Sequence, residues 1–526
     1  MRDRLAIAAG IAALTFLSYF QFPGHTWLAS DTQIYVPMLE HIWNPSALAH
    51  DLVATKPHLA FTLYDEIAIA LRWITHSSFK TVLTAEQFVF RASEIFGVFL
   101  LAASFPLTRR LAMLVAALFT LGATIVGPAV LTFEYEPVPR AFSIGLIFLA
   151  IGLAAQGHLM LADIAAAASF LYHPPTVWVF WALYLWLTLR HRDYRDLWPL
   201  AIGILLLLVS SQLQPGAAES QAFFTRISPE LEKLQRMRAS YNWVSTWPAQ
   251  TIWQYVSLWI VSLIAFWRVR PKAGRLFLIG MPALGILSVP LSYLLLEKLK
   301  WGLIPQFQLG RAVLFVTAFA VILAAAAGIR AAQSKRWIES ILWFAIVFAV
   351  PTAPRLFSIR GAQIALVLAL AIAIVLAVYL QRYRWAPALP MIAAFFLLPS
   401  VGHVRNYPNV DSTAIDNLAQ FARAQTPKDA VFLFGDAGQA LYPGVFRAEA
   451  LRAVYVDWKS GGQMNYHESI AMEWWQRWQE TSGLRFNHLP SPDIDYLVLA
   501  PNHRLPDRKP VYENTQFVLY SLPKPN

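Results

Sequence analysis

Long apolar runs separated by short charged clusters dominate residues 1–403 of the chain. Runs of this kind are typical of transmembrane helices, which need about 20 mostly apolar residues to cross a bilayer. Several runs are shorter, so we expect their helices to extend into neighbouring residues. The pattern predicts about thirteen transmembrane helices, over Leu5–Phe22, Phe88–Pro106, Leu111–Leu131, Ala141–Gln156, His158–Tyr172, Thr176–Leu189, Leu197–Gln212, Thr251–Trp267, Leu276–Leu296, Ala312–Gly328, Trp337–Val350, Ala362–Leu380 and Pro387–Val401.

Basic residues gather in alternate loops between these runs. Short loops rich in Lys and Arg stay on the cytoplasmic side of a bacterial inner membrane. We therefore expect the N-terminus inside and a large first outer loop over residues 23–87. The segment Ser18–Pro23 is bulky and offers no small-residue cleavage site, so we expect the first helix to remain uncleaved. The clusters are Arg109-Arg110, Arg190–Arg195, Arg268–Lys272, Lys335-Arg336 and Arg382–Arg384.

The chain becomes more polar over residues 404–526. Short β-rich runs alternate there with helical patterns, which is typical of a small α/β domain. An odd number of spans places this C-terminal domain outside the cytoplasm, in the periplasm. The expected strands are Ala430–Gly435, Ala453–Trp458, Tyr496–Ala500 and Phe517–Leu522, and the expected helices are Ser412–Ala424 and Tyr466–Glu480.

Composition supports the membrane assignment. Hydrophobic residues make up 57% and charged residues 14% of the chain, whereas a soluble domain carries about 25% charged residues. The net charge of +11 lies largely in the loops, where membrane orientation explains it, so no nucleic-acid partner is expected. The chain has no cysteine, which excludes disulfides, zinc thiolate sites and a cysteine nucleophile.

The first candidate site follows the first apolar run, in Ser30-Asp31-Thr32-Gln33-Ile34-Tyr35. An acidic side chain at the outer membrane boundary would lie near the phosphate or sugar of a lipid headgroup. Because burying a charged side chain there is costly, such a residue is a candidate for function. The alternative is that Ser30 or Asp31 caps a helix beginning near Thr32. Asp51 is a further acid in the same loop.

The second candidate is Phe133-Glu134-Tyr135-Glu136-Pro137. Two acids two residues apart in an extended segment point the same way. Their oxygens suit one hard divalent cation, Mg²⁺ or Mn²⁺. The alternative is a solvated loop in which Arg140 forms an ion pair.

Two further segments could contact a phosphate. His173 lies between two predicted helices in Tyr172-His173-Pro174-Pro175, where the alternative is a turn residue. Arg311 enters a helix N-terminus after Gln306-Phe307-Gln308, which is unfavourable for the helix dipole unless an anion lies nearby. The alternative for Arg311 is a side chain that extends to the membrane interface. Arg355 is a weaker case of the same kind.

Together these features resemble the GT-C superfamily of polyprenyl-phosphate-dependent glycosyltransferases. Asp31, followed by Tyr35, resembles the acidic motif of the family's first outer loop, and Glu134-Tyr135-Glu136 matches the position of its second acidic motif. The Trp-Trp-Asp-Tyr-Gly motif of oligosaccharyltransferases is absent, so recognition of a peptide sequon is not expected. The nearer comparison is with uncharacterised bacterial members, through His50-Asp51, Phe446-Arg447 and Trp458-Lys459.

The resemblance implies transfer of a sugar from a polyprenyl-phosphate donor to an extracytoplasmic glycan, lipid or protein. Asp31 would be the general base, and Glu134 and Glu136 would hold the metal. Asp457-Trp458-Lys459 would contact the acceptor or serve the structure. The alternative is a non-catalytic membrane protein, either a lipid or polysaccharide transporter or an assembly scaffold. The expected donor-binding residues are Arg311, His173, Arg140 and Gln308, with Tyr35, Asp51 and Arg355 as additional candidates.

Overall fold

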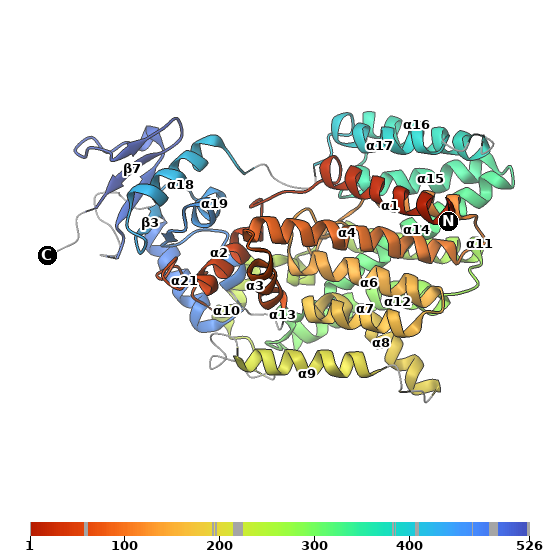
Figure 1. The fold of residues 1–526 in the computed structure, drawn as a ribbon, viewed down its shortest axis with the longest axis horizontal. Helices are drawn as coiled ribbons and strands as arrows, with labels where there is room; N and C mark the ends of the chain where they lie inside the picture. Colours follow the sequence, from red (N-terminus) through yellow and green to blue (C-terminus); the bar gives the residue numbers. More distant parts are fainter. Residues whose placement is uncertain are drawn as a thin grey trace.

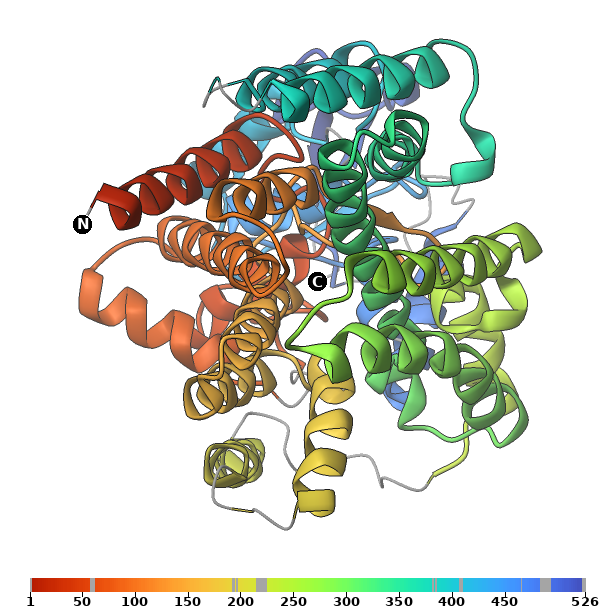
Figure 2. The ribbon, with the colours of Figure 1, turned by 90° about the vertical axis from the view of Figure 1, so that its right-hand side faces the viewer.

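The computed structural model describes residues 2–56, 62–191, 194, 197–213, 225–380, 383, 386–405, 410–464, 466–482 and 493–522. Most of the chain forms a bundle of helices, and the C-terminal part forms a small α/β unit at one end of that bundle (Figure 1). Seen from the opposite end, the helices surround a common centre with the tail behind them (Figure 2).

Each of the thirteen predicted spans contains one helix of the bundle. Among the described residues, five helices are long and apolar enough to cross a membrane, and several shorter apolar helices accompany them. The chain is therefore a multi-pass membrane protein. The bundle helices are α1 (Arg2–Phe20), α4 (Phe79–Ala103), α5 (Arg109–Phe119), α6 (Pro139–Ala155), α7 (Leu159–Tyr172), α8 (Pro174–His191), α9 (Trp198–Leu213), α11 (Ala249–Val269), α12 (Arg275–Ser292), α14 (Val313–Gln333), α15 (Trp337–Thr352), α16 (Ala362–Tyr379) and α17 (Ala388–Ser400).

Helix α14 forms the centre of the bundle. Its sequence is apolar on every face, and nearly all of its side chains are buried. It contacts α5, α11, α12 and α15. A helix without a polar face belongs in the interior of a bundle, so the N-terminal end of α14 is held firmly at the end where the tail lies.

Helices α4 and α6 pack with their backbones in contact. A Cβ added to Gly97 would lie 2.3 Å from the Phe148 carbonyl carbon, and one added to Gly152 would lie 2.2 Å from the Gly97 oxygen. Small residues allow this close approach between membrane helices. Helix α6 begins with Pro139 and Arg140, so this packing fixes the position of Arg140.

The predicted helix over Leu111–Leu131 is wrong in its second half. Helix α5 ends at Phe119, and the chain then forms a hairpin of β1 (Thr124–Ile125) and β2 (Val130–Leu131). Gly122 and Gly127 adopt positive φ angles of 76° and 94°, which glycine accepts at no steric cost. The apolar residues of this stretch are buried in a turn, which hydropathy alone does not separate from a helix.

The first outer loop is also helical. It contains α2 (Thr32–Trp43) and α3 (Tyr64–Thr75), and α4 begins at Phe79 rather than at Phe88 because Ser78 caps it by accepting a hydrogen bond from the Thr81 N–H. Together with α10 (Pro229–Arg238), α13 (Ile304–Phe307) and the short 3-10 helix η6 (Leu309–Ala312), these elements lie between the bundle and the tail (Figure 1).

The tail forms a five-stranded sheet in the order β4-β3-β5-β7-β6. Strands β3, β4 and β5 are parallel, whereas β7 is antiparallel to both β5 and β6. The strands are β3 (Val431–Phe434), β4 (Ala453–Val454), β5 (Tyr496–Leu499), β6 (Tyr512–Glu513) and β7 (Val518–Ser521), and the helices are α18 (Thr413–Gln425), α19 (Tyr442–Ala450), α20 (Gly461–Met464) and α21 (Glu468–Thr481).

Several features of the tail differ from the sequence prediction, which contained no counterpart of α19, α20 or β6. Helix α19 lies between β3 and β4, and it packs against α2 of the first outer loop. Strand β4 is only two residues long, where the pattern predicted Ala453–Trp458. The chain after β4 leaves the sheet and turns toward the bundle, which brings Lys459 to the cavity described below.

Candidate functional site

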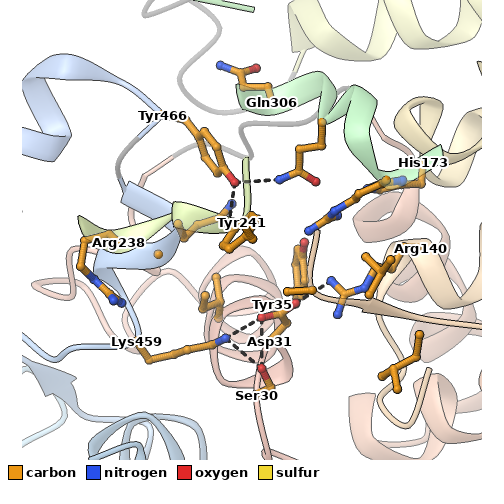
Figure 3. Close-up of a pocket in the computed structure, with 18 of the residues that line it drawn as sticks. Ser30, Asp31, Tyr35, Arg140, His173, Arg238, Tyr241, Gln306, Lys459 and Tyr466 are labelled. Atoms are coloured by element: carbon orange, nitrogen blue, oxygen red, sulfur yellow. Dashed lines mark hydrogen bonds and ion pairs between the residues drawn. The ribbon is translucent and has the colours of Figure 1, made fainter. Parts of the chain in front are cut away.

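A cavity of about 400 Å³ lies where the bundle meets the tail. Its walls come from the start of α2, the segment that ends at Arg140, the junction of α7 and α8, the end of α10, the η6 region and the tail around α20. Figure 3 shows that these side chains point toward one another although they come from distant parts of the chain. Of the residues predicted from sequence, Asp31, Tyr35, Arg140, His173, Gln308 and Arg311 line it.

Glu136 caps helix α2. Its carboxylate accepts hydrogen bonds from the backbone N–H groups of Ser30 at 2.7 Å and Asp31 at 2.6 Å, and from the Thr32 hydroxyl at 2.5 Å. A carboxylate at a helix N-terminus satisfies free N–H groups and is favoured by the helix dipole. The alternative in which Ser30 or Asp31 caps α2 is wrong, because Asp31 makes no side-chain cap bond and the cap comes from a distant loop.

The side chain of Asp31 is therefore available to the cavity. Its Oδ2 lies 2.6 Å from Arg140 Nη1, and its Oδ1 lies 2.5 Å from Lys459 Nζ. Burial alone would raise the pKa of this carboxyl, but Lys459 and Arg140 outweigh burial and hold the pKa far below its usual range. The carboxyl of Asp31 is therefore ionised at neutral pH.

Glu134 holds Arg140 in place. Its two oxygens lie 2.7 Å from Nε and 3.2 Å from Nη2 of the guanidinium, which is a bidentate pair. Val138 is extended, as expected of a residue that precedes a proline, and Pro139 occupies the first turn of α6. The ion pair that was the alternative for this segment is present, but it is buried rather than solvated.

The predicted metal ligands do not fit a metal. Glu134 and Glu136 are both buried inside the protein, and Tyr135 between them faces the cavity. The carboxylate oxygens already accept hydrogen bonds from Arg140 and from the start of α2, so binding a divalent cation would break those bonds. Within the described part of the chain, no group of three His, Asp or Glu side chains could hold a metal ion.

Arg311 lies just before α14 and faces the cavity. Gln308 has a positive φ of 50°, which turns the chain from α13 into η6 and aims Arg311 inward. Among the described residues Arg311 forms no ion pair, and its buried Nε has no hydrogen-bond partner. Burial, and then the neighbouring Arg140, lower the pKa of Arg311, so the site holds an arginine whose charge is not compensated.

His173 faces the cavity between α7 and α8. Its Nδ1 lies 2.8 Å from the Thr176 hydroxyl. Burial, and then the charges of Arg311 and Arg140, lower the pKa of His173 well below its usual value. The imidazole is therefore neutral, and it can donate or accept a hydrogen bond without adding charge.

A group of neutral polar side chains also lines the cavity. The Gln308 amide donates to the Tyr466 hydroxyl at 2.9 Å, and the hydroxyls of Tyr241 and Tyr466 are 3.1 Å apart. Tyr466 belongs to the tail and Tyr241 to the short helix η3 (Ser240–Asn242) after α10. Aromatic faces with amide and hydroxyl groups suit a sugar ring, which is neutral and rich in hydroxyls.

Lys459, Arg238, Tyr241 and Tyr466 were not assigned to the site from sequence, although Lys459 lay in a segment noted as an acceptor contact. One signal was present: Arg238 and Lys459 are basic residues in segments predicted to lie outside, where positive charge is not needed for orientation. The sequence could not show which part of the cavity Arg238 or Lys459 would reach. Lys459, for example, contacts Asp31, which is 428 residues away in sequence.

Two of the additional candidates lie elsewhere. Asp51 is fully buried, and its Oδ2 accepts hydrogen bonds from Arg447 Nε at 2.7 Å and the Val454 N–H at 2.9 Å. Arg447 also pairs with Asp457, so Asp51 ties the first outer loop to the tail. Arg355 is exposed and does not line the cavity. The prediction that Asp51 and Arg355 belong to the site is therefore wrong, because neither lines the cavity. A residue can lie on the outer side of the membrane without reaching the cavity.

The electrostatics of the cavity favour an anion. The described residues that line it include four basic side chains, Arg140, Arg238, Arg311 and Lys459, and one carboxylate, Asp31. Arg140 and Lys459 are paired with carboxylates. Arg311 and Arg238 are not paired among the described residues, and arginine is well suited to bind phosphate oxygens. The site therefore places an ionised carboxylate beside a space that attracts phosphate.

Comparison with known proteins gives partial matches. A family model described as a domain of unknown function (DUF6798) matches residues 413–481. This segment runs from α18 to α21 and supplies Lys459 and Tyr466 to the cavity. Among curated proteins, none matches the chain.

Solved structures resemble the chain over most of its length. ArnT from Cupriavidus metallidurans in the apo state is 13% identical, with a TM-score of 0.49, and the match covers 99% of this chain and 98% of that one. ArnT bound to undecaprenyl phosphate matches at 13% identity and a TM-score of 0.47, covering 99% of this chain and 97% of that one. The arabinofuranosyltransferase AftD from Mycobacteria matches at 15% identity and a TM-score of 0.42, covering 95% of this chain and 35% of that one. Because these similarities are low, the activity is inferred below from this chain's own residues.

Proposed function

We propose that this protein is a GT-C-like membrane glycosyltransferase that transfers a sugar from a polyprenyl phosphate to an acceptor outside the cytoplasm. One observation carries the proposal: an ionised carboxylate, Asp31, shares a cavity with an arginine, Arg311, whose charge is not compensated among the described residues. A base beside a phosphate-binding group is what displacement at a phosphorylated anomeric carbon requires.

The proposed step is an inverting displacement. The acceptor hydroxyl oxygen attacks the anomeric carbon, its proton passes to Asp31, and the bond from that carbon to the phosphate oxygen breaks. The leaving polyprenyl phosphate takes the bonding electron pair. Arg311 and Arg140 stabilise its charge, and His173 offers a neutral hydrogen bond. In an enclosed site, cations placed in advance act more strongly than they would in water.

The low pKa of Asp31 makes it a weak base until the donor binds. A phosphate that enters the cavity shares the charge of Arg140 and Lys459, and this raises the pKa of Asp31 toward its usual value. Proton transfer is then favoured only when the donor is present. In this scheme arginine and lysine neutralise the phosphate, and no step passes through a metal.

The proposal includes the placement of the protein in a bacterial inner membrane. With thirteen spans and the N-terminus inside, the cavity and the C-terminal α/β domain of residues 404–526 face the periplasm. The lipid tail of the donor would lie among membrane helices, with its phosphate at Arg311. The acceptor, a glycan, lipid or protein, would enter from the side of the tail.

The test is turnover by purified protein in detergent, supplied with a polyprenyl-phosphate-linked sugar and a cell-envelope fraction as acceptor. We expect release of free polyprenyl phosphate. Asp31→Asn keeps the shape of the side chain and removes the base, so turnover should fall by roughly 100- to 10,000-fold. Binding of polyprenyl phosphate by this variant, measured separately, shows whether the fold and the phosphate site survive.

Two results would contradict the proposal. Full activity in the Asp31→Asn protein would remove Asp31 from the chemistry. Binding of the polyprenyl-linked sugar without any turnover, across envelope fractions, would favour the non-catalytic alternative of a transporter or an assembly scaffold.

A further inference from the structure

Arg238 is a cation of the cavity that the proposed reaction does not use. Its guanidinium lies 3.6 Å from the ring centroid of Trp458, and it donates a hydrogen bond to the Trp458 carbonyl. Among the described residues it forms no ion pair, and its buried Nε has no hydrogen-bond partner. When a guanidinium stacks on an aromatic ring, the ring covers one of its faces. The N–H groups at its edge can still donate hydrogen bonds in the plane of the guanidinium.

The surroundings hold Arg238 in place. It ends α10, whose preceding turn is fixed by Arg236, and Arg236 pairs with Glu232 at 2.9 Å and Glu297 at 3.3 Å. Trp458 packs against Trp474, which is fully buried and donates a hydrogen bond to the Asp457 carbonyl at 3.0 Å. Of two arginines two residues apart on α10, one has two carboxylate partners and the other faces the cavity without one.

Arg238 and the phosphate-binding residues lie on different walls. In Figure 3, Arg238 is on the tail side with Lys459, while Arg140 and His173 are on the opposite side, and Asp31 lies between. An inverting displacement brings the acceptor to the face of the anomeric carbon opposite the leaving phosphate. A group bound at Arg238 is therefore on the side from which the acceptor arrives.

We infer that Arg238 is the anchor of a second oxyanion site, which binds a phosphate or carboxylate carried by the acceptor. The inference rests on the proposed function only in assigning the first anion site, at Arg311, to the donor phosphate. It narrows the acceptor from any glycan, lipid or protein to one that bears a negative charge near the hydroxyl that reacts.

The test counts anion sites with two probes, farnesyl phosphate and inorganic phosphate. Thermal unfolding of the purified protein in detergent is followed at constant ionic strength, with chloride replacing phosphate as the reference. After saturation with farnesyl phosphate, added inorganic phosphate should still raise the unfolding temperature of the wild-type protein. In Arg238→Gln the phosphate concentration for half of this response should rise about ten-fold or more, since a charge-assisted hydrogen bond is lost.

A matched control is available in the same part of the chain. Arg477 also stacks on an aromatic ring, at 4.9 Å from the centroid of Tyr455, but it pairs with Glu473 and lies outside the cavity. Arg477→Gln should keep the phosphate response. Arg238→Lys, which keeps the charge, should recover part of it.

Two outcomes would overturn the inference: a wild-type protein that loses its phosphate response once farnesyl phosphate is bound, or an Arg238→Gln protein that keeps the full response. Failure of the proposed function looks different. In that case farnesyl phosphate does not bind, while Arg238→Gln still raises the inorganic phosphate concentration needed for half of the response, and the second site stands.

Discussion

At the scale of single residues, the site depends on which charges are compensated. Asp31 pairs with two cations, and Glu134 pairs with one of the same two. Arg311, in contrast, pairs with no carboxylate among the described residues. An arginine that is partly buried without a counter-ion is costly unless a ligand supplies the charge. This is why Arg311, rather than the better paired Arg140, is the residue whose loss should weaken binding of the lipid phosphate most directly.

Arg311→Gln removes that charge and keeps a polar side chain. We expect the dissociation constant for farnesyl phosphate to rise by roughly ten- to one-hundred-fold, because a charge-assisted hydrogen bond is lost. Titration of the detergent-purified protein measures it. Arg355→Gln, at an exposed position outside the cavity, is the control and should bind as the wild type does. Equal affinities in the two variants would exclude Arg311 from the phosphate site.

The ion pairs of Asp31 predict how stability depends on pH. The pKa of Asp31 in the folded protein lies below its value in the unfolded chain, about 3.9. Its stabilising contribution is therefore present above that value and is lost as pH falls toward the folded-state pKa. The difference in unfolding temperature between wild type and Asp31→Asn should be constant from about pH 5 to 8 and should shrink below about pH 4. A difference that instead shrinks as pH rises from 5 to 8 would contradict the pairing.

At the scale of elements, one loop positions the start of one helix. Glu136 supplies the cap of α2, so the side chain of Asp31 is left for the cavity. Glu136→Ala should leave buried N–H groups at the start of α2 unpaired and lower the free energy of unfolding by about 1–3 kcal/mol. It should also reduce turnover, because Asp31 loses its fixed position.

The control for this prediction is an ordinary cap elsewhere. Ser412 accepts a hydrogen bond from the Ile415 N–H at the start of α18, in the tail. Ser412→Ala should cost about 1 kcal/mol of stability, the usual value for a lost cap, and leave turnover unchanged. Calorimetry together with the turnover assay separates the two cases. If both variants lose stability but neither loses turnover, Glu136 has no part in positioning Asp31.

At the scale of the whole molecule, the proposal depends on topology. The loop between α11 and α12 contains Arg270 and Lys272 and follows Arg268 in the last turn of α11. This loop should be cytoplasmic, while Ser412 at the start of α18 should be periplasmic. The chain has no native cysteine, so single cysteines report their own side. A Pro271→Cys protein should resist a membrane-impermeant thiol reagent in cells with an intact inner membrane, and a Ser412→Cys protein should react with it. Reaction at position 271 would reverse the orientation.

The sequence by itself determined the membrane part and most of the tail. Each predicted span contains a helix, and the patterns for β3, β5, β7, α18 and α21 correspond to elements within a few residues. These features depend on local quantities, namely the transfer free energy of an apolar run and the period of its polar positions. The hydropathy of the apolar run gave a wrong prediction at Leu111–Leu131. The buried apolar residues in its second half form a hairpin instead of the end of a helix.

Only the tertiary structure decided what each charged side chain does. Sequence spacing predicted that Glu134 and Glu136 would lie on the same side, but it could not show that one carboxylate pairs with Arg140 and the other caps α2. It singled out Asp31, but not Lys459, which is its partner. The partners of a buried charge are set by which backbones the fold brings within about 3 Å, and each must be satisfied because an unpaired charge is costly in the interior. That condition acts between segments hundreds of residues apart, so it is absent from any local pattern.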